Sequence, residues 1–183
     1  MITRDTTTPK SAIPAAFRDR YVIRCIGQEF TTSSKGNPMI VLEWEVCGYQ
    51  NGEGILQETI TKSGKEYMIA GRRGINQYYT LIPGFPAQSY FEFREKMGLP
   101  INDIDEENPP MDHEGLVANA ILNAEQTIQR KALTDEERET LKEEGKPQVG
   151  EPILGDDGKP IIGYRVKIDM ILGRNSIEIN RPF

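Results

Sequence analysis

The 183-residue chain lacks the features that mark membrane proteins and exported proteins. No apolar run approaches the roughly 18 residues that a membrane-spanning helix needs. The first residues, MITRDTTTPKSAIP, have no apolar centre of the kind found in secretory signal peptides. We therefore expect a cytoplasmic protein without a membrane partner. Its length suits a single domain that buries a substantial core without disulfides.

Cysteine and histidine are scarce, which argues against catalytic or metal chemistry. Cys25 and Cys47 stand within apolar, alternating segments, so reduced core thiols are favoured over a disulfide or a Cys-His nucleophilic pair. His113 lies in MDHEG, where Asp112 and Glu114 are candidate metal ligands, but no second His and no Cys is near. A solvated loop histidine is the preferred interpretation. We expect no enzyme activity and no cofactor, since a metal-dependent nuclease would need a carboxylate cluster that the sequence does not place.

Positive charge is also in short supply, with 22 Lys and Arg against 28 Asp and Glu and a net charge of −6. This balance alone argues against a nucleic-acid partner, because polyanion binders usually carry a positive field. The distribution of charge reverses that impression. Residues 103–157 hold sixteen acidic side chains and five Lys or Arg, a net −11, which leaves +5 for the remainder. The acid forms one block, and the rest of the chain is mildly basic.

Alternation of apolar and polar residues, typical of half-buried strands, is abundant near the N-terminus. One face of residues 40–46 carries the apolar side chains Ile40, Leu42, Trp44 and Val46. Trp44 is therefore expected in the core rather than as a stacking residue. Residues 20–25 alternate in the same way, so residues 20–46 predict a β-hairpin whose loop covers residues 28–38. That loop is longer than a tight turn requires, which suggests a use.

Arg20 and Arg24 point away from this predicted core. Glu43 and Glu45 point the same way on the next strand, so cross-strand ion pairs compete with any ligand for the two arginines.

The rest of the chain supplies further elements, each with its own signal. We expect strands over residues 55–63, 116–131 and 161–172, a helix over residues 86–97 that ends at Gly98, and a charged helix over residues 134–145 that starts with a capping box. Residues 116–131 also fit a helix by propensity, and the strand is preferred because Gly115 precedes it and Thr127 and Ile128 favour an extended chain. Residues 66–82 are left unassigned, because Gly71 and Gly74 interrupt both the strand period and the helix period.

These elements predict a mainly β fold. Five strands, a short helix between strands three and four, and a charged helical excursion between strands four and five are the parts of an oligonucleotide/oligosaccharide-binding (OB) barrel. The same parts fit another small barrel or an α+β sheet. We expect an irregular arm over residues 1–16, one OB-like domain over residues 17–172 with an acidic insertion at 131–160, and a tail over residues 173–183.

Aromatic and basic side chains are interleaved between residues 62 and 79, with Glu66 as the single acid. Single-stranded nucleic acid needs this mixture, because cations neutralise phosphates while ring faces stack on unpaired bases at roughly 1–3 kcal/mol each. The GRRG sequence at 71–74 is not a P-loop. The alternative is a solvated basic face with tyrosines in the core or at its boundary. The candidates are Lys62, Lys65, Tyr67, Arg72, Arg73, Tyr78 and Tyr79.

Three stretches, RYVIRCIGQEF, TTSSKGNPMIVLEWEV and MGLP, resemble the single-stranded DNA-binding proteins of tailed bacteriophages. The likeness covers roughly residues 17–125 and the last strand, and it includes that family's Ser-Lys-Gly-Asn-Pro-Met hairpin. It implies an OB barrel that protects or organises single-stranded DNA during phage DNA replication or recombination, in the host cytoplasm. Lys35 and Asn37 would then flank the nucleic-acid groove, although a mobile tip without a ligand is the alternative.

The end of the chain, Pro182-Phe183, looks like the terminal Pro-Phe of bacterial single-stranded DNA-binding proteins, which recruits partner enzymes. This implies replication or recombination proteins as partners through Phe183, although the family's aspartate run is absent and Arg181 has the opposite charge. The competing hypothesis is an acidic protein-interaction module, or a nucleic-acid mimic, that acts on a host or phage protein through residues 134–145. Oligomeric state is left open.

Overall fold

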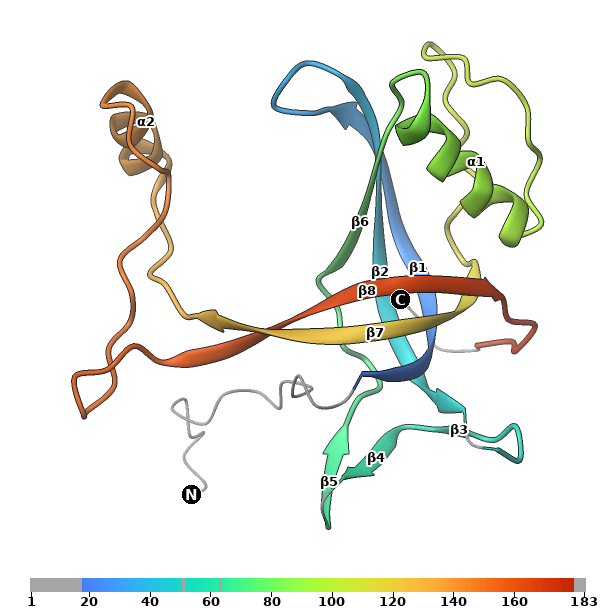
Figure 1. Ribbon diagram of the computed structural model, residues 1–183, viewed down its shortest axis with the longest axis horizontal. Helices are drawn as coiled ribbons and strands as arrows, with labels where there is room; N and C mark the ends of the chain where they lie inside the picture. The colour runs from blue at the N-terminus through green and yellow to red at the C-terminus, as the bar shows by residue number, and fades with distance from the viewer. Residues whose placement is uncertain (1–17, 51, 63, 180–183) are drawn as a thin grey trace.

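The computed structural model describes residues 18–50, 52–62 and 64–179, and its centre is a six-stranded antiparallel sheet (Figure 1). Strand order is β3-β2-β1-β7-β8, and β6 also pairs with β2. The strands of this sheet are β1 (Asp19–Thr32), β2 (Pro38–Gln50), β3 (Leu56–Gln57), β6 (Ile75–Thr80), β7 (Val117–Ile128) and β8 (Ile162–Arg174). A separate hairpin consists of β4 (Thr59–Lys62) and β5 (Lys65–Met68), and the helices are α1 (Phe85–Lys96) and α2 (Asp135–Glu143).

The core lies between the inner face of the sheet and α1. The alternation predicted for the first hairpin is confirmed, because Ile40, Leu42, Trp44 and Val46 are wholly buried, as are Ile23 and Cys25. The helix closes this core with aromatic rings. Phe93 packs edge to face on Trp44 with ring centroids 6.3 Å apart, and it stacks on Tyr79 at 5.2 Å. Such pairs stabilise a core beyond the area that they bury.

The loop of the first hairpin is shorter than predicted. Strand β1 continues to Thr32 and β2 begins at Pro38, so the turn covers only residues 33–37 and the prediction of a loop over residues 28–38 was wrong. Residues 28–32 are polar enough to resemble a loop, but each pairs in register with β2, from Gln28 opposite Leu42 to Thr32 opposite Pro38. Gly36, with φ of 78°, supplies the positive φ that the tight turn requires.

The predicted strand over residues 55–63 is divided between two sheets. β3 pairs with β2 for two residues, after which the chain leaves the sheet and β4 pairs with β5. Residues 66–82, which were unassigned, contain most of β5 and all of β6. Between these strands Gly71 and Gly74 have φ of 82° and 81°, and this glycine-flanked turn hid the alternation of β6.

The last strand is confirmed, but it does not keep one face throughout. The β7-β8 register shifts between Asn119 and Ala120 and again between Ile121 and Leu122. Each bulge moves the alternation of β8 to the other face, so Ile171 is buried while Met170 is exposed.

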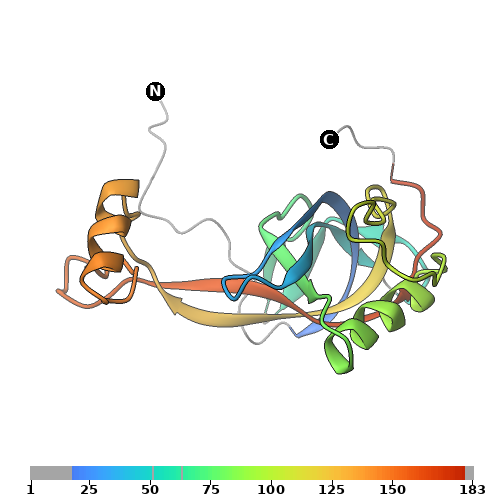
Figure 2. The same ribbon diagram turned by 90° about the horizontal axis from the view of Figure 1, so that it is seen from above.

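Beyond Leu122, β7 pairs only with β8 among the described residues, and the two strands leave the body as a long ribbon (Figures 1 and 2). We call residues 123–167 the arm and residues 129–161 the arm tip. Helix α2 lies in the tip and begins with the predicted capping box. Glu137 N donates to Thr134 Oγ1 at 3.2 Å, and Thr134 N donates to Glu137 Oε2 at 2.8 Å. The predicted excursion of the acidic insertion from a long hairpin is therefore confirmed.

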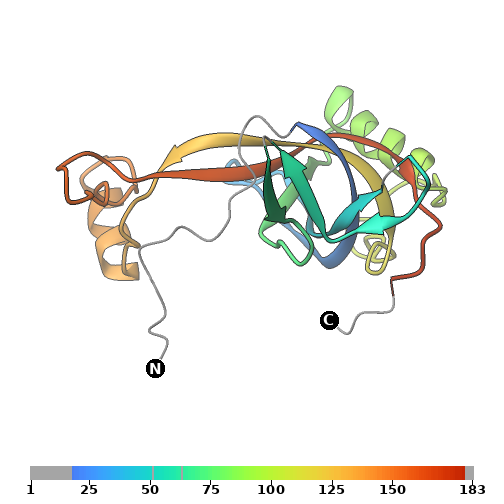
Figure 3. The same ribbon diagram turned by 90° about the horizontal axis from the view of Figure 1, so that it is seen from below.

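The fold is mainly β, as expected, but the sheet is not closed into a barrel. Strands β6 and β8 lie in contact, yet no ladder joins them in the part of the chain that the structure describes. Helix α1 contacts both strands on this side. Figure 3 shows the small β4-β5 hairpin on the side of the body opposite α1.

Within the described ranges, neither helix is long and apolar enough to cross a membrane. The predicted arm over residues 1–16 lies outside the described residues, and so does Phe183.

Candidate nucleic-acid interface

The face of β1, β2 and β6 that points away from the core carries the first candidate residue. We call it the outer face. Ile75 and Tyr79 of β6 point inward, so Tyr78 between them in the pleat points outward, opposite Val41 of β2. The Tyr78 side chain is 53% exposed, and Asn76 Nδ2 lies 3.4 Å from its hydroxyl oxygen. Tyr78 is thus an exposed aromatic side chain on a strand that is paired with β2.

Tyr79 has the opposite orientation. It is 7% exposed and stacks on Phe93, so its predicted role as a stacking face for a base is wrong. The physical reason is the two-residue period of a strand, which sends neighbouring side chains to opposite faces. Tyr67 on β5 is half-buried and packs against the main core cluster, and only part of its surface faces solvent.

The GRRG turn is fastened to β2 by two backbone hydrogen bonds. Val46 N donates to Arg72 O at 2.9 Å, and Gly71 N donates to Val46 O at 2.8 Å. Arg72 is half-buried, and burial lowers the pKa of its guanidinium without removing the charge. The Arg73 side chain is 52% exposed. The turn therefore holds two cations just before the start of β6, and Arg73 reaches the surface.

Glu45 lies between two of the arginines. Arg24 Nη2 is 2.9 Å from Glu45 Oε2, and Arg73 Nε is 3.2 Å from Glu45 Oε1. Burial raises the pKa of the Glu45 carboxyl, but hydrogen bonds from Arg24 and Arg73 outweigh it and hold that pKa below its ordinary value. The cross-strand ion pair expected for Arg24 is confirmed. Because Glu45 is compensated in this way, it does not repel an anion at this point of the surface.

Other acids on the outer face have no such partner in the described chain. Glu29 of β1 lies opposite Val41, and Glu43 of β2 lies opposite Gly27 and Asn76. Negative charge therefore gathers over β1 and the middle of β2, while β6 and the turn that precedes it are neutral or basic.

The remaining basic candidates lie at the two ends of β2. Lys35 is exposed at the tip of the β1-β2 hairpin, and the β4-β5 hairpin, with Lys62 paired to Lys65, lies at the opposite end (Figure 1). The side chains of these two lysines are outside the described part of the structure. Asn37 closes the turn, since Ser33 N donates to Asn37 O at 2.8 Å and Asn37 N lies 3.2 Å from Ser33 Oγ. Both contacts involve the backbone of Asn37, so its proposed role beside a nucleic-acid groove stays a prediction.

His113 is wholly buried, so the interpretation as a solvated loop histidine was wrong. Its Nε2 lies 2.8 Å from the Tyr90 hydroxyl oxygen and its Nδ1 lies 2.9 Å from Gln28 Oε1. Gln28 Nε2 donates to Met111 O, so its oxygen accepts from Nδ1, and Nε2 accepts from Tyr90. Burial lowers the pKa of His113 to about 4, and the ring is neutral at pH 7. The acidic sequence MDHEG gave no sign that His113 is buried, because the residues that enclose it come from distant segments.

Arg94 extends this buried network to the surface. It donates two hydrogen bonds to Asp112, at 2.8 and 2.7 Å, one to Tyr90 and one to Pro100 O at 2.7 Å. The network fastens α1 to the long loop before β7. In the described ranges, no group of three or more His, Cys, Asp or Glu residues is placed to hold a metal ion.

The two cysteines lie in the interior of the fold. Both are buried, and neither forms a disulfide in the described chain. Burial raises the pKa of the Cys25 thiol to about 12, which keeps it protonated at neutral pH.

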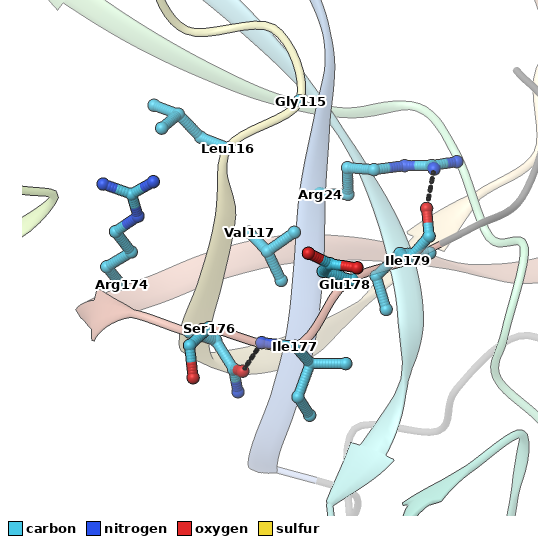
Figure 4. Close-up of a pocket in the computed structure, with 10 residues that line it drawn as sticks. Arg24, Gly115, Leu116, Val117, Arg174, Ser176, Ile177, Glu178 and Ile179 are labelled. Carbon is cyan, nitrogen blue, oxygen red and sulfur yellow. Dashed lines mark hydrogen bonds between the residues drawn. The ribbon is translucent and has the colours of Figure 1, made fainter.

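A hollow of about 600 Å³ lies where residues 175–179 cross the outer side of β1 and β7 (Figure 4). Arg24 faces it and donates to Ile179 O at 3.3 Å, and Ile177 N donates to Asn175 Oδ1 at 2.8 Å. The guanidinium of Arg24 is thus already engaged by Glu45 and by the chain itself. These contacts fasten the end of the described chain to β1.

Comparisons of the chain with protein-family models, with curated proteins and with solved structures find no match. The functional argument therefore depends on the surface described above and on the short resemblance in the sequence.

Proposed function

We propose that this protein binds single-stranded DNA without sequence preference, along a path over β2 and β6 on the outer face. The path runs from Lys35 past Tyr78 to the GRRG turn and on to the β4-β5 hairpin. The exposed ring of Tyr78, on the same short segment as Arg72 and Arg73, is the observation that carries the proposal. A stacking face beside cations suits an unpaired strand of any sequence, since every base has a π-face.

Charge on the outer face supports a path over β6 rather than over β1. Glu29 and Glu43 would repel phosphates that crossed the middle of the sheet, whereas Arg73 compensates Glu45 next to the turn. The phosphate backbone of the bound DNA would therefore pass Lys35, Arg73 and the β4-β5 hairpin.

The order of the strands supports an OB-like architecture for the body, which we propose as a distorted, incompletely hydrogen-bonded barrel. Strands pair in the order β6-β2-β1-β7-β8, α1 lies between β6 and β7 along the chain, and β6 contacts β8. OB folds bind nucleic acids over the corresponding strands and loops. With the resemblance to phage proteins, this supports a role in protecting or organising single-stranded DNA during phage replication or recombination in the host cytoplasm.

Fluorescence anisotropy of a labelled oligothymidine strand tests the proposal, with a duplex of equal length as control. Five cationic contacts, from Lys35, Lys62, Lys65, Arg72 and Arg73, predict a slope of about −3.5 in the log-log plot of affinity against salt. Affinity for the single strand would then fall about a hundredfold between 50 and 200 mM salt. No binding to the single strand at low salt, or equal binding to the duplex, contradicts the proposal.

The second candidate function is the acidic interaction module, and the composition of α2 favours it. None of its residues is buried, and three acids occupy its first turn. Partner recruitment through Phe183 also stays a hypothesis, because that residue lies outside the described chain. Deleting Phe183 and measuring binding to replication proteins tests it.

A further inference from the structure

The turn between β6 and α1 presents two apolar side chains to solvent. Phe85, the first residue of α1, is 86% exposed, more than any other large apolar side chain in the described chain. Ile82, three residues earlier, is 37% exposed. Exposed apolar side chains that gather in one place, unlike single scattered ones, mark binding surfaces.

This turn is fastened by its own backbone. Gly84 has a φ of 103°, which a residue with a side chain rarely adopts. Ala87 N donates to Ile82 O at 3.2 Å, and Gln88 N donates to Gly84 O at 3.0 Å. The Phe85 side chain has only two dihedral angles of its own. A ligand that contacts its ring would therefore lose little affinity to the ordering of the protein.

The turn is continuous with the proposed DNA path. Leu81 N donates to Pro38 O at 2.8 Å, which fastens the end of β6 to the start of β2. Figure 1 shows the β6-α1 turn and the β1-β2 hairpin at the same end of β2. Tyr78 lies on β6 only two residues before this strand ends. A strand of DNA that passes Tyr78 toward the hairpin would therefore reach the turn.

The charge of the segments that meet here suits a phosphate backbone. Lys35 is the only charged residue within residues 31–42 and 75–91 taken together. A phosphate at this point would meet one cation and no carboxylate from either segment, while the apolar ring of Phe85 would be left for a base. The acids Glu29 and Glu43 of the outer face stand outside both segments.

We propose that Phe85, flanked by Ile82, stacks on an unpaired base and forms the end of the single-stranded DNA path beside the Lys35 hairpin. This inference rests on the proposed function and adds a second stacking position to Tyr78. A ring face accepts any base, which agrees with binding that has no sequence preference. The path would then follow the whole of β2, about 40 Å for 13 residues, from the β4-β5 hairpin to this turn.

Tryptophan fluorescence of Phe85→Trp tests the contact directly, because Trp44 is the only natural tryptophan and is wholly buried. We expect oligothymidine to quench the emission of the introduced indole, since a stacked base covers it. Leu154→Trp is the matched control. It places an indole at another exposed position, on the arm tip and away from the path, where DNA should leave the emission unchanged.

Loss of the ring gives the second readout. Phe85→Ala should weaken binding to an oligothymidine of about 16 nucleotides at least about fivefold, which corresponds to one weak base-aromatic stack. A strand of about 4 nucleotides, too short to reach from the GRRG turn to α1, should show a smaller loss. Circular dichroism checks that every variant is folded.

The outcomes separate this inference from the proposed function. If the unaltered chain binds no oligothymidine, both are wrong. If it binds but Phe85→Ala binds equally well, or if the indole of Phe85→Trp is quenched no more than that of Leu154→Trp, this inference alone is wrong. Self-association without DNA that Phe85→Ala abolishes, with unchanged DNA binding, would assign the turn to a protein contact and would also overturn it.

Discussion

The Tyr90 hydroxyl lies 2.8 Å from His113 Nε2, and this contact joins α1 to the loop that precedes β7. His113 is wholly buried, and its other ring nitrogen reaches Gln28 of β1. One neutral imidazole therefore ties together three segments that lie far apart in the sequence. Protonation would add an N–H at Nε2 of the ring. This N–H would point at the Tyr90 hydroxyl, which already accepts a hydrogen bond from Arg94.

We predict that acid destabilises the fold through His113. Its pKa is about 4 in the folded chain, below the ordinary value of 6.5, so between these values the unfolded chain binds more protons. Stability is therefore fully present above pH 6.5 and is lost as the pH falls toward 4, by about 3 kcal/mol from this residue. Urea unfolding at a series of pH values measures the loss.

The control for this prediction is His113→Asn, which is expected to be less stable at pH 7 but to lose the pH dependence of the 4 to 6.5 window. Asp112, whose carboxyl pKa is held below its usual range by hydrogen bonds from Arg94, acts only at lower pH. An equal slope in both proteins would show that His113 does not cause the loss.

We predict that Tyr78→Ala weakens binding to oligothymidine by roughly 1–3 kcal/mol, because it removes one stacking face. Tyr78→Phe should keep most of the affinity, since the ring and not the hydroxyl contacts the base. Anisotropy titrations measure both. Ile55→Ala serves as the control for an exposed apolar residue on the body, and a similar loss in that variant would refute a specific role for Tyr78.

The contrast between Tyr78 and Tyr79 also illustrates what sequence could predict. Alternation correctly placed Ile23 and Cys25 of β1 and residues 40–46 of β2, because the two-residue period is unbroken within each of these stretches. The same rule would have separated Tyr78 from Tyr79, but Gly71 and Gly74 interrupt the pattern before β6 and left that segment unassigned. Within the candidate interface, Lys35 and Arg73 are exposed as expected.

Contacts between distant segments were beyond prediction. His113 stands in an acidic, polar sequence, and its burial depends on Tyr90 and Gln28, which no local pattern links to it. The 86% exposure of Phe85, the first residue of α1, was missed for the opposite reason, since an apolar residue at the start of a helix is usually covered. Its exposure is visible only once the turn from β6 to α1 is placed.

We predict that Arg24 and Arg73 have different roles although both bind Glu45. Arg73→Ala should reduce the salt slope of oligothymidine binding by about 0.7 and change stability by less than about 1 kcal/mol, because its side chain is 52% exposed. Arg24→Ala should destabilise the fold by about 1–3 kcal/mol, since its side chain is 5% exposed and its loss leaves Glu45 with one partner. Urea unfolding and salt titrations of both variants separate the roles. Equal effects on the salt slope would contradict this division.

We predict that removal of the arm tip leaves the body folded and able to bind single-stranded DNA. Gln129 N donates to Ile161 O at 2.9 Å, so these residues are close enough for an Asn-Gly turn to replace residues 130–160. The replacement removes nine acidic and six basic residues, which makes the chain less negative. Affinity for oligothymidine should stay the same or rise. Loss of DNA binding in this folded variant would move the function to the arm and favour the acidic interaction module.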